Sequence, residues 1–482
     1  MNTQNLTLLT DLYELTMMQG YFETQENETV IFDVFFRNNP NNGGYSIMAG
    51  LDQVIDYIKN LNFSYEDVDY LRGLGIFTED FLHYLSGFHF SGDIYAIREG
   101  SVIFPKEPLL KIVAPIMEAQ LVETAILNSI NHQCLIATKA SRVVYAAQGD
   151  GIMEFGLRRA QGPDAGLYGA RAAMIGGCVG TSNVLAGQMF DVPVMGTHAH
   201  SWIMSFKDEY TAFKEYARLY PNACTLLVDT YDTLKSGVPN AIRVFTEMRD
   251  AGIHPKSYGI RLDSGDLAYL SKKARKMLDE AGFTDAVIAA SNDLDEFLIN
   301  DLKIQGAKIG SWGVGTNLIT SKDCPSFGGV YKLSAIQNND GEFIPKIKIS
   351  ENVEKITNPG DKTIYRVYDK ETGKIRADLI CFADETWNEE DELLLFDPNA
   401  TWKKTRLPGG SYTMKEILLP IFKHGECIYE SPSVMEIAQF CKEEKETLWD
   451  ETKRLFNPHG VYVDLSRSLY DTKNRLLDDM SK

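Results

Sequence analysis

The chain has 482 residues, 44% of them hydrophobic and 24% charged, which is enough for two or three folded cores and argues against disorder. A formal net charge of −19 argues against a nucleic-acid partner, because such proteins present a basic face to the phosphates. The N-terminus lacks the basic and apolar regions of a secretory signal, and no stretch reaches the ~18 uncharged apolar residues of a membrane span. We therefore expect a cytoplasmic protein.

The seven cysteines are dispersed and include no C-x-x-C pair, which indicates reduced thiols and not a disulfide framework. His424 and Cys427 form an isolated H-x-x-C. No second ligand pair lies near them in sequence, so we expect no zinc site there.

The N-terminal part, up to about residue 115, is predicted to mix helices and strands. Apolar residues recur at helical spacing over 10–22 and 50–61, and strand-like runs cover 30–36 and 93–115. A long helix is predicted over 116–147.

From about residue 151 to 336, short apolar runs end in polar or glycine residues and are followed by helical stretches. Their spacing suits repeated βα units, which favours a parallel α/β barrel with its site at the carboxyl ends of the strands; an open doubly wound sheet would place a site similarly. The candidate strand ends are Glu154-Phe155-Gly156, Gly180-Thr181-Ser182, Gly196-Thr197-His198, Asp229-Thr230-Tyr231, Arg261-Leu262-Asp263, Ser291-Asn292-Asp293, Gly310-Ser311-Trp312 and Leu333-Ser334-Ala335.

The pattern changes after residue 336, where lysines, β-branched residues and turns dominate, with a further strand signal near 411–419. We expect the C-terminal third to complete the small N-terminal domain. The predicted domains are 1–135 and 341–482, which together form a small α/β domain, and 136–340, the barrel.

Arg158 and Arg159 lie just beyond the first of these strands. Two guanidiniums on a strand-to-helix loop suit a phosphate or a carboxylate, and a surface ion pair with neighbouring acids is the alternative.

His198 and His200 follow the third strand. At i, i+2 on an extended segment they could share a metal ion, whereas a turn would separate them. A single nucleophilic or acid/base histidine is the other possibility. Such a histidine needs a carboxylate to fix its tautomer, and Asp229, at the end of the next strand, is placed for that role.

Arg261, Asp263 and Asp266 surround a Ser-Gly turn. A guanidinium beside two carboxylates suits a ribose or a pyrophosphate bound through Mg²⁺. Asp263 or Ser264 could equally cap the following helix.

The segment 310–317, GSWGVGTN, is a glycine-rich strand-to-helix turn. Backbone N–H groups at Gly313 and Gly315 and the Thr316 hydroxyl could cradle a phosphate. The spacing matches neither a Walker A motif nor a dinucleotide-binding fingerprint.

Together these segments resemble the nicotinate phosphoribosyltransferase family over nearly the whole chain. The matching motifs are TDLYELTMMQGY (10–21), FFRNNP (35–40), EFGLRRAQGPDAG (154–166), GTSNVLAG (180–187), VPVMGTHAHS (192–201), LVDTYD (227–232), RLDSGDL (261–267) and GVGTNL (313–318).

The resemblance implies a homodimeric type II phosphoribosyltransferase, with an irregular TIM-like α/β barrel and an α/β domain built from both chain ends. The family joins nicotinate to phosphoribosyl pyrophosphate in the first step of NAD synthesis from nicotinate. ATP is a co-substrate and is hydrolysed to ADP and phosphate, pyrophosphate is released, and Mg²⁺ is the cofactor. We expect substrate phosphates to carry most of the Mg²⁺, with Asp263 and Asp266 as further candidate ligands.

The resemblance also implies site roles. His200 falls on the histidine that ATP phosphorylates, while His198 falls where the family varies and receives no role. Tyr13 falls on a ring-stacking tyrosine donated across the dimer. The remaining candidates are Asp229 and Asp263 as catalytic carboxylates and Phe155, Arg158, Ser182, Thr197, Arg261, Gly313, Gly315 and Thr316 as substrate contacts.

Ser182 stands where the related nicotinamide phosphoribosyltransferase has an aspartate that accepts from the carboxamide. Because an aspartate would repel the nicotinate carboxylate, serine favours the acid over the amide. An aldolase or isomerase acting on a sugar phosphate is a rival from another class, but no lysine lies among the strand ends. A non-catalytic binding protein would not need so many polar strand ends.

Overall fold

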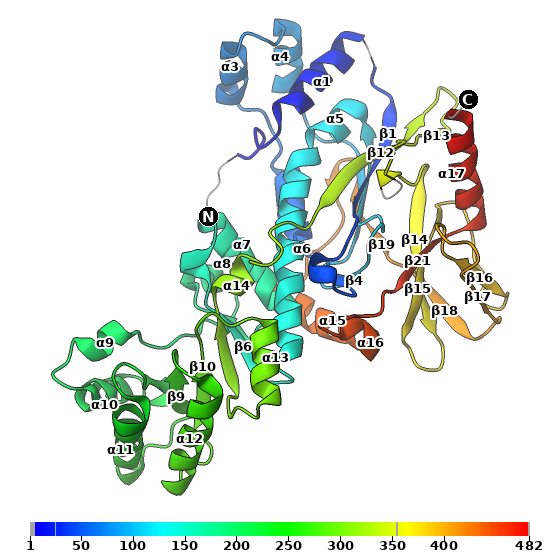
Figure 1. Cartoon of the computed structure of the whole chain (residues 1–482). Helices are drawn as coiled ribbons and strands as arrows, with labels where there is room; N and C mark the ends of the chain where they lie inside the picture. The colour runs from blue at the N-terminus through cyan, green and yellow to red at the C-terminus, as the bar shows by residue number, and fades with distance from the viewer. Residues whose placement is uncertain (1–4, 25, 353–354, 481–482) are drawn as a thin grey trace. The chain divides into compact units, whose positions relative to one another are not determined.

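The computed structural model describes residues 5–24, 26–352 and 355–480. The chain divides into two compact units, one formed by Ile136–Pro325 and the other by Met1–Leu135 together with Ser326–Lys482 (Figure 1). Within the described residues, no helix is both long enough and apolar enough to cross a membrane.

The unit Ile136–Pro325 is built on a parallel sheet with strand order β7-β6-β11-β10-β9-β8 (Figure 1). Its strands are β6 (Gly151–Glu154), β7 (Gly180–Thr181), β8 (Cys224–Leu227), β9 (Tyr258–Leu262), β10 (Val287–Ala290) and β11 (Ser311–Val314). Its helical elements are η2 (Leu157–Arg159), α7 (Pro163–Gly176), α8 (Val184–Phe190), α9 (His200–Met204), α10 (Glu209–Leu219), η3 (Pro221–Ala223), η4 (Thr233–Gly237), α11 (Val238–Asp250), α12 (Leu267–Glu280), α13 (Glu296–Ile304) and α14 (Thr316–Ile319).

Strands β8 to β11 pair in chain order and β6 pairs with β7, while β11, the last strand in sequence, pairs with β6, the first. Val194 adds a parallel bridge to Thr181 beside β7. The predicted alternation of strands and helices is therefore confirmed for β6 to β11. The carboxyl ends of these strands meet at one edge, which is where the polar residues that end the predicted strands gather.

Two of the predicted strand ends are wrong. Leu333-Ser334-Ala335 lies inside β12 (Gly329–Gln337), which pairs antiparallel with β1 (Thr29–Phe36) in the other unit. Apolar alternation predicts a strand but not its partner or direction. Strand β11 begins at Ser311, so its polar end is Gly315-Thr316 and not Gly310-Ser311-Trp312.

The unit formed by both chain ends contains two larger sheets. We call them the N-terminal sheet, with order β13-β12-β1-β5-β3-β19-β20, and the C-terminal sheet, with order β18-β14-β15-β21. Their strands not yet given are β3 (Asp93–Ile97), β5 (Leu110–Pro115), β13 (Phe343–Pro345), β14 (Lys362–Asp369), β15 (Ile375–Phe382), β18 (Tyr412–Glu416), β19 (Leu418–Lys423), β20 (Glu426–Cys427) and β21 (Tyr462–Leu465). Short pairs join β2 (Ser46–Ile47) to β4 (Val102–Ile103) and β16 (Leu393–Phe396) to β17 (Lys404–Leu407).

The helical elements of this unit agree with the predictions for its N-terminal part. The predicted helix 116–147 is present but breaks at Val122, and the strand signal at 411–419 resolves into β18 and β19. The elements are α1 (Leu12–Thr24), η1 (Pro40–Asn42), α2 (Leu51–Lys59), α3 (Tyr65–Gly73), α4 (Glu79–Ser86), α5 (Ile116–Leu121), α6 (Glu123–Ala146, which extends past residue 135), α15 (Val434–Glu446), α16 (Asp450–Lys453) and α17 (Arg467–Met480).

A buried ion cluster centres on Arg366 of β14. Its guanidinium donates through Nη2 to Asp378 Oδ2 (2.7 Å) and through Nε to Asp378 Oδ1 (3.0 Å), both on β15. Its Nη1 donates to Glu444 Oε2 on α15 at 3.1 Å. Arg366 and Asp378 are almost fully buried. Burial and the charge of Asp378 raise the pKa of the nearby Glu107 well above its usual value.

The Arg366→Met variant should lose about 3 kcal/mol or more of unfolding free energy, because it leaves a buried carboxylate without its countercharge. Urea denaturation at neutral pH measures the loss. Arg467→Met is the matched control, since it breaks an exposed pair with Asp471 and should cost less than about 1 kcal/mol. Equal midpoints for the two variants would contradict the importance of the Arg366 cluster.

Candidate active site

A cleft of about 600 Å³ opens at the carboxyl ends of the parallel strands in the unit Ile136–Pro325. It brings together ten of the predicted site residues: Phe155, Arg158, Ser182, Thr197, His200, Arg261, Asp263, Gly313, Gly315 and Thr316. The cleft also includes Arg159, His198, Ser291, Asn292 and Asp293.

Arg261, at the end of β9, connects three of the loops around this cleft. It donates through Nη1 to Thr197 Oγ1 (2.7 Å), through Nε to Ser291 Oγ (2.8 Å) and through Nη2 to Asp263 Oδ1 (3.0 Å). Three donors of one planar group are thus used on three different partners. The guanidinium is consequently fixed in place before any ligand arrives.

Asp263 is the carboxylate at the centre of this arrangement. Burial acts to raise its pKa, but hydrogen bonds from Ser291 and Arg261 and the positive charge of Arg261 outweigh burial and lower it. Asp263 is therefore ionised at neutral pH. Its Oδ1 accepts from Arg261 and Ser291, while its Oδ2 faces His200.

His200 is the first residue of α9, and its side chain is 40% exposed. Its Nε2 lies 3.5 Å from Asp263 Oδ2, and its Nδ1 lies 3.0 Å from Thr230 Oγ1. Both ring nitrogens therefore have an orienting neighbour, and the ring remains accessible from the cleft.

The predicted pairing of Asp229 with His200 is wrong. Asp229 Oδ2 accepts from the Asp263 backbone N–H (2.8 Å) and from Ser264 Oγ (2.7 Å), and its Oδ1 has no hydrogen-bond partner. The carboxylate turns toward the loop after β9 because that loop offers it two donors. It is the next residue, Thr230, that reaches the imidazole, so Asp229 holds the loop carrying Asp263.

His198 and His200 diverge, as the turned alternative anticipated. His198 is buried, and its Nε2 accepts from the Leu227 backbone N–H at 3.3 Å, while its ring packs edge-on against Tyr216. Burial lowers the pKa of His198 to about 4, so it is neutral at pH 7. The imidazole thus satisfies a backbone donor at the end of β8, a structural role that sequence reasoning missed.

Phe155 explains the glycine at position 313. A side-chain Cβ at Gly313 would lie 2.5 Å from the Phe155 ring, so the ring packs directly over the strand backbone. A Cβ at Gly315 would lie 3.1 Å from the Phe155 carbonyl oxygen. Space for the Phe155 ring at Gly313 and for the Phe155 backbone at Gly315, and not only access to a phosphate, therefore accounts for these glycines.

Arg158 and Arg159 belong to the exposed turn η2 at the mouth of the cleft. Neither guanidinium forms an ion pair with any acidic side chain of the described ranges, so the surface-pair alternative is not realised. Both cations remain available to an anion.

Asp266 is not a cleft residue. Its carboxylate accepts from the Tyr269 backbone N–H at 2.9 Å and caps α12, the role that the sequence suggested for Asp263 or Ser264.

Asn292 and Asp293 line the cleft, although the sequence pattern predicted only that they end a strand. Both adopt left-handed backbone conformations (φ 86° and 31°), which are uncommon outside glycine and which sequence patterns do not reveal.

Tyr13 lies in the other unit, on α1, and does not line this cleft. Its side chain is 45% exposed. Burial of the hydroxyl and the charge of the neighbouring Glu123 raise its pKa. Leu12 and Met17 are exposed apolar residues of α1, and the exposed Leu9 lies just before the helix.

No cluster of three or more histidine, cysteine or acidic side chains suited to a metal ion occurs in the part of the chain that the structure describes. His424 is 95% exposed beside Asp93. None of the seven cysteines forms a disulfide within the described residues.

Comparisons with known proteins agree with this geometry. Residues 8–131 match the nicotinate phosphoribosyltransferase N-terminal domain, 151–372 the nicotinate phosphoribosyltransferase family and 361–473 its C-terminal domain. Nicotinate phosphoribosyltransferase of Bacillus subtilis is 46% identical over 477 residues, which cover 99% of this chain and 96% of the relative. The human protein of the same name is 31% identical over 97% of this chain and 96% of its own length.

Two solved structures extend the likeness to the fold. Human nicotinic acid phosphoribosyltransferase superimposes with a TM-score of 0.85 at 28% identity, covering 97% of this chain and 99% of the other. Nicotinate-nucleotide pyrophosphorylase of Pyrococcus furiosus gives 0.70 at 23% identity over 93% and 97%, which indicates a shared fold. The chain belongs to the nicotinate phosphoribosyltransferase family.

Proposed function

We propose that this protein joins nicotinate to phosphoribosyl pyrophosphate, forming nicotinate mononucleotide and pyrophosphate, and that His200 couples the reaction to ATP hydrolysis. The observation that carries this proposal is the accessible His200 imidazole, held between Thr230 and Asp263 in the same cleft as the Arg261 fork. Family membership supports the choice of substrates. The product is the first intermediate of NAD synthesis from nicotinate.

The nicotinate carboxylate would bind among hydroxyl and guanidinium donors. Thr197 and Arg261 are already hydrogen-bonded to each other, and Arg158 is an unpaired cation at the mouth of the cleft. Phe155 offers a ring face or edge for the pyridine. Ser182 lines the cleft without adding a negative charge, which favours nicotinate over nicotinamide.

The phosphoribosyl pyrophosphate would occupy the side of the cleft formed by Gly315 and Thr316. This is a late strand-to-helix loop of the sheet, a common phosphate position in α/β barrels. The cleft contains no lysine among its lining residues, so a Schiff-base aldolase has no nucleophile there.

Mg²⁺ fits the cleft as a substrate-carried ion. Asp263 is ionised and turns Oδ2 toward the open side, but it is a lone carboxylate and not part of a cage. Mg²⁺ in phosphoryl-transfer sites is commonly held by one or two carboxylates together with substrate phosphates. When bound, it would neutralise the developing charge on the pyrophosphate.

The coupling step is phosphoryl transfer to the imidazole. A lone pair of a His200 ring nitrogen forms a bond to the γ-phosphorus of ATP while the bond to the ADP oxygen breaks. Water later attacks the phosphohistidine, the P–N bond breaks, and phosphate leaves. The added anionic oxygens would order Mg²⁺ and pyrophosphate before glycosidic bond formation, and their loss would favour product release.

A homodimer is part of this proposal. Tyr13 and its apolar neighbours on α1 present the kind of exposed patch that a second subunit covers. A tyrosine from the partner subunit would then complete the pyridine pocket.

We further propose that the parallel sheet belongs to an irregular TIM-like barrel. The pairing of β11 with β6 brings the last strand to the first, as barrel closure requires. Between the Val194 segment and β8, side-chain contacts of His198 and Arg261 take the place of a backbone ladder among the described residues. This gap would be the irregular part of the barrel.

The central test mixes the protein with nicotinate, phosphoribosyl pyrophosphate and Mg²⁺, with and without ATP, and measures mononucleotide formation. Nicotinamide in place of nicotinate should give little product. His200→Ala should abolish phosphorylation from γ-labelled ATP and the ATP stimulation, whereas His254→Ala, an exposed histidine outside the cleft, should retain both. Full ATP stimulation of His200→Ala would refute the coupling role.

Thr230→Val should slow the phosphorylation of His200 by about fivefold, because removing one hydrogen bond to the ring costs about 1 kcal/mol. Thr230→Ser keeps a hydroxyl and should restore the rate. Single-turnover labelling with γ-labelled ATP measures it. If Thr230→Val labels as fast as the parent protein, Thr230 does not position the ring.

Gly313→Ala should displace the Phe155 ring and raise the nicotinate KM by about tenfold, an effect of the size that overpacking produces. Gly310→Ala, in the segment just before β11, is the control, because its Cβ would meet no atom within 4 Å. Initial rates at varied nicotinate concentration distinguish the two. Unchanged KM in Gly313→Ala would mean that the ring position is irrelevant to binding.

A further inference from the structure

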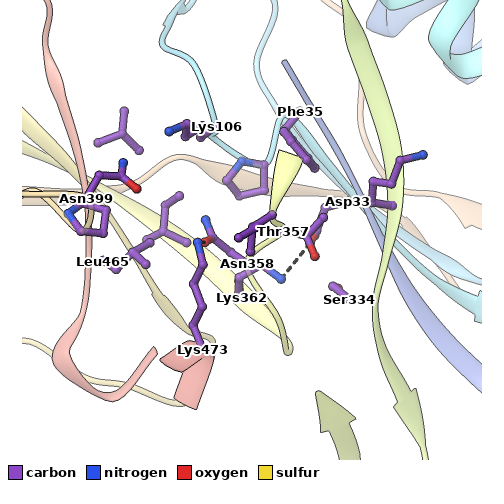
Figure 2. Close-up of a pocket in the computed structure, with 16 residues that line it drawn as sticks. Asp33, Phe35, Lys106, Ser334, Thr357, Asn358, Lys362, Asn399, Leu465 and Lys473 are labelled. Atoms are coloured by element: carbon purple, nitrogen blue, oxygen red, sulfur yellow. Dashed lines mark hydrogen bonds and ion pairs between the residues drawn. The ribbon is translucent and has the colours of Figure 1, made fainter. Parts of the chain in front are cut away.

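A second cavity, unrelated to the cleft, lies in the unit formed by both chain ends. It is enclosed by the facing sides of β1 and β12 of the N-terminal sheet, β14, β15 and β21 of the C-terminal sheet, and helix α17 (Figure 2). Facing sheet surfaces normally carry apolar side chains, yet the charged residues here are Asp33, Lys106, Lys332, Lys362 and Lys473.

One of these lysines has an acidic partner, and a second has a backbone acceptor. Lys362 is fully buried, and its amine lies 2.7 Å from Asp33 Oδ2 (Figure 2). Lys332 donates to the Tyr331 carbonyl oxygen at 2.6 Å. The nearby Asp361 is bound by Lys111 at 2.7 Å, so it supplies no countercharge to the cavity.

Lys473 forms no ion pair with any acidic side chain among the described residues. Its side chain extends from α17 into the cavity, and its amine donates to the neutral Asn358 Oδ1 at 2.8 Å (Figure 2). A half-buried ammonium held only by an amide oxygen is costly unless an anion joins it.

Lys106 is the second uncompensated cation. Its amine forms no hydrogen bond or ion pair with any other described side chain. Its backbone is left-handed (φ 77°), an unusual conformation for lysine, and is held there by its N–H, which donates to the Phe36 carbonyl oxygen at 2.7 Å. The turn thus places this lysine at the cavity despite backbone strain.

We propose that this cavity is a binding site for a small tetrahedral oxyanion such as inorganic phosphate, held by the amines of Lys106 and Lys473. The cavity measures about 40 Å³, room for about three water molecules or one such anion, and too little for a nucleoside. Thr357 and Asn399 line the same space and can donate hydrogen bonds from a hydroxyl and an amide. Of the described residues that line the cavity, only Asp33 carries a negative charge, and Lys362 neutralises it.

The site should depend on pH in a defined direction. Burial, with the charges of Lys106 and Lys362, lowers the pKa of Lys473 from 10.5 to about 8. Because the unfolded chain then binds more protons between pH 8 and 10.5, stability without the anion rises with pH across that window. An anion favours the protonated amine, so its affinity should fall as pH rises above about 8.

The experiment measures the melting temperature of the full-length protein against inorganic phosphate, at constant ionic strength in chloride, at pH 7 and pH 9. Phosphate should raise the melting temperature at pH 7 and much less at pH 9. Lys473→Met and Lys106→Met should each weaken this phosphate effect by about tenfold in apparent Kd, the loss expected for a charge-assisted hydrogen bond. Lys473→Arg should retain it.

Lys442→Met, an exposed lysine on α15 of the same unit, controls for net charge and should respond like the parent protein. Phosphate bound in the catalytic cleft contributes equally to all these proteins and cancels in the comparison. Pyrophosphate or ATP at the same concentration should separate the melting temperatures of the parent protein and Lys473→Met no further than inorganic phosphate does, since neither fits the cavity. The proposal fails if both methionine variants keep the phosphate-dependent rise in melting temperature of the parent protein. It also fails if ATP separates the melting temperatures of the parent and Lys473→Met further than phosphate does, because the site would then take a nucleotide phosphate.

Discussion

The guanidinium of Arg261 joins the segment before α9 to the carboxyl ends of β9 and β10. It reaches Thr197 before α9, Ser291 after β10 and Asp263 after its own strand. The parallel sheet runs from β7 to β8, but the described residues form no ladder between the Val194 segment and β8. Side chains cross that gap instead, since His198 accepts the Leu227 N–H and Arg261 binds Thr197. The position of His200, two residues after His198, depends on these contacts.

Much of the candidate site could be predicted from sequence because parallel strands bring their carboxyl ends to one edge. Residues that follow strands 30 or more positions apart, such as Phe155, Thr197 and Arg261, can therefore be predicted to meet although the path between them is unknown. The same reasoning misplaced Leu333-Ser334-Ala335, because apolar alternation does not tell an antiparallel strand in a second sheet from a parallel one in the first.

What the sequence could not provide is the direction in which a side chain turns. Asp229 and Thr230 are adjacent, and the carboxylate is chemically the better partner for an imidazole. The structure gives that contact to Thr230, because the loop after β9 offers Asp229 two donors at once. Gly313 is a similar case. A glycine-rich turn suggests a phosphate, but only the packed Phe155 ring accounts for the missing side chain.

The electrostatics of the chain follow from local and not from total charge. At −19 the protein as a whole repels phosphorylated anions, yet screening at physiological ionic strength limits that field to about 8 Å. Within that range the cleft presents Arg158, Arg159 and Arg261 against few acids, of which Asp263 is largely compensated. The cavity between the two sheets repeats the arrangement with Lys106 and Lys473. Arg158 and Arg159 in the cleft, and Lys106 and Lys473 in the cavity, form no ion pair with a described acidic side chain, and an anion bound there would supply the missing negative charge.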